Sequence, residues 1–172
     1  MRCALALVAL ALAAPLHAQE AWVGVSAHEV DTPFTRDVDE SGVDIQAGYR
    51  FARQNALAAI GRPAPYVLAV VNPRGDTSLV AAGLSWKLGD AVYLRPGIGI
   101  AVHDGPRRRE DAWGFRTDLG SRVLFEPELA VGARLSDRLA IEASWIHVSH
   151  AQLFSRQNPG LDIIGARLVI GL

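Results

Sequence analysis

Residues 91–103 read AVYLRPGIGIAVH, an alternation of two kinds of side chain. Every second residue from Val92 to Val102 is apolar or proline, whereas the residues between them combine glycine and alanine with Tyr93 and Arg95. A period of two is typical of a β-strand, because successive side chains of a strand point to opposite faces. This stretch therefore predicts a strand with one greasy face and one face of small and charged residues.

The same alternation recurs on both sides of this stretch. We expect strands near residues 20–28, 41–52, 65–72, 78–88, 91–103, 119–135, 138–149 and 161–171. The long connections are 29–40, 104–118 and 150–160, and the tight turns are at 89–90 and 136–137. Long loops at one end and short turns at the other are typical of outer-membrane barrels, and the long connection 53–64 is the exception here.

Two architectures fit alternating strands, a soluble sandwich and a membrane barrel. A sandwich would bury the greasy rows and expose the charges. A barrel is favoured because the polar rows are rich in glycine and alanine, which suit a cramped interior, and because charges of both signs can pair there. These charges are Arg95, Arg122, Arg134 and Arg167, with Glu126, Glu128 and Glu142. We therefore expect an all-β, eight-stranded antiparallel outer-membrane β-barrel whose greasy rows face lipid.

The first 18 residues predict a secretory signal, with Arg2, an apolar run over 4–14, and Pro15 before a cleavage point after Ala18. The expected organisation is thus a signal over 1–18 and a transmembrane barrel over 19–172, located in the outer membrane.

Composition excludes several classes of function. The single cysteine, Cys3, lies inside the predicted signal, so the mature chain has neither disulfides nor thiolate metal sites. A net charge of −1 offers no nucleic-acid footprint. No histidine and carboxylate set has metal-ligand spacing, so we expect no metal and no cofactor.

His147, Ser149 and Asp162 form the candidate catalytic set. His147 and Ser149 are two residues apart on one strand and share its apolar row, and Asp162 lies in the apolar row of the next strand. All three are therefore predicted at the loop end of the lipid-facing wall. Singly, they are explained as an interface histidine, a polar strand end and a loop cap; in register, they favour a serine, its base and an orienting acid.

The segment WIHVSHAQL over 145–153, followed by NPGLD over 158–162, resembles the PagL family of lipid A 3-O-deacylases. That family's pattern is His-x-Ser-Asn-Ala-Gly-Leu, then Asn-x-Gly and an acidic residue. The match covers roughly residues 119–172, and the remainder is similar in architecture alone. The resemblance implies an eight-stranded outer-membrane barrel with its active site on the outer wall.

By this resemblance, Ser149 is the nucleophile, His147 the base and Asp162 the orienting acid. Three departures stand out: Asp162 is shorter than the family's usual glutamate, His150 replaces an asparagine associated with the oxyanion, and Gln152 replaces a small residue. His150 is either an oxyanion contact or a loop surface residue. Gln152 and Asn158 are candidate oxyanion or substrate contacts, with a plain turn the simpler interpretation for 158–160.

The implied function is a serine esterase that hydrolyses the 3-O-linked acyl chain of lipid A, with lipopolysaccharide as substrate and no cofactor. Two alternatives remain, a non-catalytic small barrel and an esterase for another membrane lipid. The remaining polar and aromatic residues that stand out have simple structural interpretations. His28 and His103 are strand ends with no evident partner; Arg107, Arg108, Arg109 and Arg156 are basic loops that could attract lipid A phosphates; Trp86, Trp113 and Trp145 suit an aromatic belt.

Overall fold

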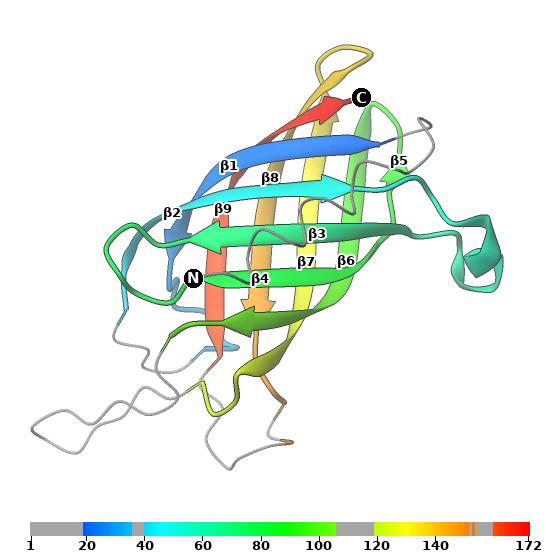
Figure 1. Cartoon of the computed structure of the whole chain (residues 1–172). Helices are drawn as coiled ribbons and strands as arrows, with labels where there is room; N and C mark the ends of the chain where they lie inside the picture. Colours follow the sequence, from blue (N-terminus) through cyan, green and yellow to red (C-terminus); the bar gives the residue numbers. More distant parts are fainter. Residues whose placement is uncertain (1–18, 36–39, 106–118, 152, 154–159) are drawn as a thin grey trace, which may run out of the picture.

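The computed structural model describes residues 19–35, 40–105, 119–151, 153 and 160–172, and Figure 1 shows a closed cylinder of antiparallel strands. The strands are β1 (Glu20–His28), β2 (Gly42–Arg50), β3 (Ala64–Val71), β4 (Leu79–Ser85), β5 (Leu88–Gly89), β6 (Val92–His103), β7 (Val123–Arg134), β8 (Leu139–Val148) and β9 (Leu161–Gly171). Long strands adjacent in sequence pair with each other, and β1 pairs with β9 to close the barrel. The eight-stranded antiparallel barrel is confirmed, while the predicted signal, 1–18, lies outside the described residues. Within those residues, no helix is long and apolar enough to cross a bilayer.

Two of the labelled strands, β4 and β5, are parts of one strand. Both pair with β6 in a single register, since Ser85 lies opposite Gly97 and Leu88 lies opposite Leu94. The ladder breaks between them at Pro96, whose carbonyl accepts a hydrogen bond from Trp86 N–H at 2.9 Å. Proline has no N–H to return that bond, so regular pairing is interrupted without any change in register.

The two ends of the barrel differ in their connections. Strands β1, β3, β6 and β8 end at one end of the barrel, the loop end, and β2, β5, β7 and β9 end at the other, the turn end, where connections 51–63, 90–91 and 135–138 lie. The connection that departs from the long and short alternation contains a 3₁₀ helix, η2 (Asn55–Ile60). Trp86 Nε1 donates to the Ile60 carbonyl at 2.6 Å and so ties η2 to the barrel wall.

The exterior wall is apolar on every long strand. Large hydrophobic side chains stand exposed in alternate positions, with Val23 56% and Val92 69% accessible. The same surface carries Val25, Val43, Ile45, Val71, Val80, Leu94, Ile98, Ile100, Val131, Ile141, Ile164, Leu168 and Ile170. A continuous surface of this kind is too large for a soluble monomer and suits the hydrocarbon of a bilayer. The predicted direction of the greasy rows is confirmed.

The lumen is filled by charged side chains near its middle and turn end. Glu142 Oε1 accepts from Arg95 Nε at 2.9 Å and from Tyr93 OH at 3.0 Å, and its Oε2 accepts from Arg50 at 3.2 Å. Arg167 donates to Glu128 at 2.9 Å in the same network. Buried charges are tolerated when they are paired and hydrogen-bonded, which is what this network achieves.

Two arginines expected in that network lie elsewhere. Arg122 donates to the carbonyls of His103 at 3.2 Å and Gly105 at 2.5 Å, at the loop end. Arg134 pairs with Asp90 at 2.9 Å at the turn end. The assignment of these two arginines to the lumen was wrong, because both lie at strand ends where main-chain carbonyls or a surface carboxylate are nearer.

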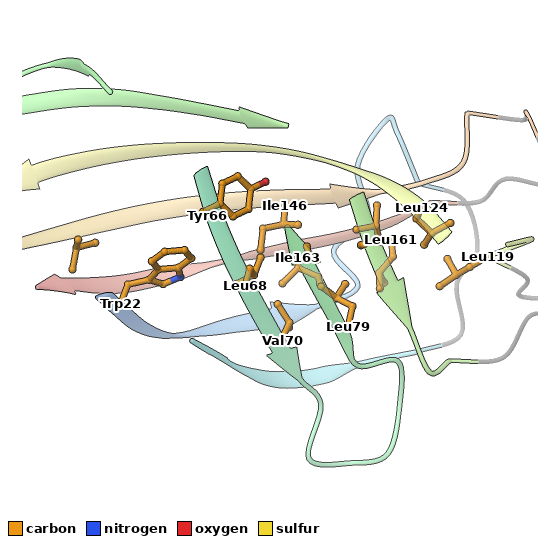
Figure 2. Packing of buried hydrophobic residues seen from close by; sticks show 14 of the residues in the cluster. Trp22, Tyr66, Leu68, Val70, Leu79, Leu119, Leu124, Ile146, Leu161 and Ile163 are labelled. Carbon is orange, nitrogen blue, oxygen red and sulfur yellow. The ribbon is translucent and has the colours of Figure 1, made fainter. Parts of the chain in front are cut away.

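Toward the loop end, apolar side chains fill the lumen behind β8 and β9. Figure 2 shows the packed cluster, which extends from Trp22 and Tyr66 to Leu119. Its loop-end members include Leu68, Val70, Leu79, Leu124, Ile146, Val148, Leu161 and Ile163. The inward rows of β8 and β9 are thus anchored in a close-packed core, directly behind the outward residues at the end of these strands.

His28 and His103 both have partners, so the expectation of none was wrong. His28 lies between two carboxylates, with Nδ1 2.8 Å from Asp44 and Nε2 2.9 Å from Glu40. Glu40 also accepts from the Thr77 hydroxyl at 2.9 Å, which joins the β1–β2 and β3–β4 connections. His103 Nε2 lies 2.6 Å from the Ser121 carbonyl. The carboxylate of Glu40, twelve residues from His28, could not be placed beside it from spacing alone.

Candidate active site

His147 and Asp162 lie directly opposite each other on β8 and β9. His147 Nδ1 is 2.7 Å from Asp162 Oδ1, and the carboxylate is completely buried. The Asp162 carbonyl accepts from Val30 N–H at 2.9 Å, so its backbone groups point toward β1 and not toward β8. The pair is therefore of the non-hydrogen-bonded type, whose Cα atoms approach to about 4.5 Å rather than about 5.5 Å. This closeness allows the short aspartate to reach the imidazole.

Asp162 is held by two further donors. Trp145 Nε1 donates to Oδ1 at 3.0 Å, and the Thr32 hydroxyl donates to Oδ2. An ionised carboxylate is an acceptor only, so three donors divided between its two oxygens suit it and restrict its orientation. The arrangement gives a buried charge the hydrogen bonds that it needs.

The imidazole of His147 is oriented by its partners. In the neutral ring, a proton on Nδ1 is donated to Asp162, which leaves Nε2 as an acceptor. The ring packs near Trp145 and against the edge of Phe34, with centroid distances of 6.1 Å and 6.2 Å. Gly160 lies against the Cε1 and Nε2 side, where an added Cβ would be 2.7 Å from Cε1. A glycine is required there by this approach and also by its φ of 72°.

Ser149 follows the last residue of β8 and is held by a bridge to β7. Its N–H donates to the Phe125 carbonyl at 3.1 Å, and Phe125 N–H donates to the Ser149 carbonyl at 2.7 Å. Pro127 lies opposite His147, between this bridge and the regular ladder that begins at Glu128. Proline has no N–H, so it cannot continue the pairing. Cross-strand partners share a face, so Ser149 lies on the outer wall with Phe125 and in the same row as His147.

The serine is half-buried and close to the pair in sequence, yet no hydrogen bond joins its hydroxyl to the His147 ring among the described residues. In catalytic sites this bond often forms or tightens only with substrate in place. The structure therefore brings the histidine and aspartate into contact across β8 and β9, and places the serine two residues after the histidine in the same outward row.

The other candidates have different positions. His150 is completely buried and not on the loop surface. Gln152 and Asn158 lie outside the described residues, as do Trp113 and the loop arginines 107–109 and 156. Within the part of the chain that the structure describes, no group of three or more His, Cys, Asp or Glu side chains is placed to hold a metal ion.

Three contributors escaped the sequence reasoning: Thr32, Phe34 and the indole N–H of Trp145. Trp145 lies in the same outward row as His147, close to Asp162 on the next strand. Its indole N–H needs an acceptor on a face that meets lipid, and this could have indicated the bond to Asp162. Thr32 and Phe34 belong to the β1–β2 connection, 130 residues from Asp162 in the case of Thr32, and no local pattern points to them.

Comparisons with known proteins bear on the family and the fold. A family model described as lipid A 3-O-deacylase (PagL) matches residues 69–170, more than half of the chain. The crystal structure of the outer membrane enzyme PagL superposes with a TM-score of 0.60 at 20% identity, covering 89% of this chain and 99% of that one. Neisserial surface protein A (NspA) gives 0.55 at 11% identity, covering 90% and 97%. At these identities the two structures show a shared fold. A search of curated protein sequences finds no match.

Proposed function

Because the chain belongs to the lipid A 3-O-deacylase (PagL) family, we propose that Ser149, His147 and Asp162 hydrolyse the 3-O-linked acyl ester of lipid A in the outer membrane. The observation that carries this proposal is the 2.7 Å contact between His147 Nδ1 and a buried carboxylate on the outer wall. A histidine oriented in this way, with a serine in the same row, is the arrangement that activates a hydroxyl nucleophile.

The steps follow from these three side chains. His147 Nε2 takes the proton of Ser149 as Oγ attacks the ester carbonyl, and Asp162 stabilises the imidazolium. The imidazolium then protonates the departing sugar oxygen, which leaves an acyl group on Ser149. His147 next takes a proton from the water that attacks the acyl-serine, and the imidazolium returns this proton to Ser149 Oγ as the ester bond breaks and a 3-hydroxy fatty acid is released.

The oxyanion has to be stabilised by groups after the serine. Ser149 N–H is already donated to Phe125, so it does not serve. The backbone N–H group of Ala151 lies two residues further on, and Ala151 has a φ of 50°, a left-handed conformation that turns the chain sharply at this point. Successive N–H groups around such a residue can form a concave anion-binding site. Gln152 and Asn158 remain proposed contacts to substrate.

The acyl chain has an apolar surface to occupy. A shallow depression of about 470 Å³ lies on the outer wall, lined by Val23, Gly24, Val25, Ile45, Ile141, Ala166, Arg167 and Leu168. Ala166 is four residues along β9 from Asp162, which is about 13 Å at the rise of a strand. A fatty acyl chain whose ester is at Ser149 is long enough to extend into this depression.

The test is the mass of lipid A from cells that make the protein. Wild-type chain should remove one hydroxyacyl mass, and Ser149→Ala or His147→Ala should abolish the change, with rates lowered at least about 10⁴-fold. Correct barrel assembly is checked by the shift in electrophoretic mobility on heating. Unaltered lipid A with a folded wild-type barrel would indicate a non-catalytic barrel, and loss of acyl groups from phospholipid alone would indicate another lipid substrate.

A further inference from the structure

We propose that Thr32 is a positioning residue for catalysis, which holds the Asp162 carboxylate in the orientation that His147 requires. The inference rests on the proposed function of His147 and Asp162 and extends the site to the β1–β2 connection. It comes from three observations: the direction of the Thr32 hydroxyl, the construction of its turn, and the burial of Asp162.

The direction of the Thr32 hydroxyl is determined by its neighbours. Its oxygen accepts a hydrogen bond from Phe34 N–H at 3.0 Å, and its proton goes to Asp162 Oδ2. Because the carboxylate oxygen can only accept, Thr32 has to be the donor. The two oxygens of Asp162 are thus divided between tasks: Oδ1 receives His147 and Trp145, and Oδ2 receives Thr32.

The turn that carries Thr32 is built to keep this direction. Thr32 N–H donates to the Thr35 hydroxyl at 3.0 Å, and Thr35 N–H returns a bond to the Thr32 carbonyl at 3.2 Å. Two residues before Thr32, Val30 N–H donates to the Asp162 carbonyl at 2.9 Å. The segment from Val30 to Thr32 therefore donates hydrogen bonds to both the backbone and the side chain of Asp162.

Because Asp162 is buried, the loss of its hydrogen bond from Thr32 should matter for the site. Asp162 has no exposed surface, so water cannot replace a lost donor, and a buried ionised group with a missing hydrogen bond is costly. Without the Thr32 hydroxyl, Oδ2 lacks a donor, and the carboxylate is expected to rotate toward another one. That rotation would move Oδ1 away from Nδ1 of His147. Phe34, which belongs to the same turn, packs against Trp145 at a ring-centroid distance of 5.7 Å.

The experiment measures kcat and KM of purified, folded variants on lipid A in detergent micelles. Thr32→Val keeps the shape and removes the hydroxyl, and we expect kcat to fall about 10- to 100-fold with KM little changed, as for loss of one bond to a charged group. Thr32→Ser keeps the hydroxyl and should restore most of kcat. Asp31→Asn, at an exposed neighbouring position, is the matched control. Should the valine variant fail to assemble, Thr32→Ala carries the same test.

A double-mutant cycle separates positioning from a general structural role. If Thr32 acts through the carboxylate, Thr32→Val should have no further effect on the residual rate in an Asp162→Ala background. An equal loss in both backgrounds, a wild-type kcat for Thr32→Val, or a Thr32→Ser variant as poor as Thr32→Val would each overturn the proposal. Failure of the proposed function is a different result, since Ser149→Ala would then leave hydrolysis unchanged.

Discussion

Replacing Asp162 by asparagine isolates the role of the negative charge. Two donors converge on Oδ1, Trp145 Nε1 at 3.0 Å and His147 Nδ1 at 2.7 Å, while Oδ2 receives the Thr32 hydroxyl. Since the indole N–H can only donate, the amide oxygen of the variant has to occupy the Oδ1 position. The amide nitrogen then meets the Thr32 oxygen, which is able to accept. Asp162→Asn should therefore keep the tautomer of His147 and lose the charge alone.

The size of the loss follows from electrostatics. The charge acts when His147 becomes an imidazolium, and two opposite unit charges about 4 Å apart attract by about 4 kcal/mol at an effective dielectric constant of about 20. We expect kcat to fall by about 10³-fold. An inverted tautomer in a serine triad costs about 10⁴-fold, so the two outcomes are separable. Adding Trp145→Phe frees the amide to turn, and the double variant should lose roughly a further factor of ten.

The assay is release of 3-hydroxy fatty acid from lipid A in micelles, followed by mass spectrometry, on barrels whose folding is verified by heat-modifiable mobility. A kcat for Asp162→Asn within about threefold of wild type would show that the carboxylate does not stabilise a charged intermediate. A loss that does not depend on Trp145 would refute the argument about the orientation of the amide.

Three other perturbations test separate parts of the structure. Gly160→Ala places a Cβ 2.7 Å from Cε1 of His147 and should lower kcat about tenfold or more in the same assay; an unchanged kcat would contradict the close approach. Arg167→Ala leaves buried carboxylates unpaired and should destabilise the barrel by about 3–5 kcal/mol, measured as a lower urea midpoint; an unshifted midpoint would argue against the network. Burial works to raise the pKa of Glu40, but hydrogen bonds, first that from His28, outweigh it and hold the pKa below its usual 4.5. A lowered folded-state pKa means that this stabilisation is present above pH 4.5 and is lost as the pH falls below it. The protection of loop-end amides from hydrogen exchange, taken relative to the intrinsic exchange rate at each pH, should therefore fall in acid, and Glu40→Gln should remove that dependence; an identical acid response in the variant would count against it.

Much of the fold followed from alternation. The row from Val92 to Val102 determines which side of β6 faces lipid, and the same reasoning placed His147 and Asp162 on the outer wall, where they lie. Period-two patterns report direction well because each residue's face depends only on its neighbours in the chain. Pro96 interrupts the hydrogen bonds that β6 makes with β4 and β5, but it does not change the alternation of side chains in 78–88. This stretch was therefore correctly predicted as one strand.

Contacts between distant segments could not be obtained in this way. The partners of His28, the displacement of Arg122 to main-chain carbonyls, and the bond from Thr32 to Asp162 all depend on how loops fold over the end of the barrel. Loop conformation is determined by tertiary hydrogen bonds and not by periodicity, so the sequence contains no local signal for it.

The pairing of β1 with β9 has a consequence for when the enzyme becomes active. Ser149, His147 and Asp162 belong to the last hairpin, whereas Thr32 and Val30 follow the first strand, and the two groups meet only once the termini of the chain have joined. In a chain whose barrel has not yet closed, the proposed nucleophile and base are present, but Asp162 lacks the hydrogen bonds from Thr32 and Val30. We therefore expect the proposed site to be complete only once the barrel has closed in the outer membrane.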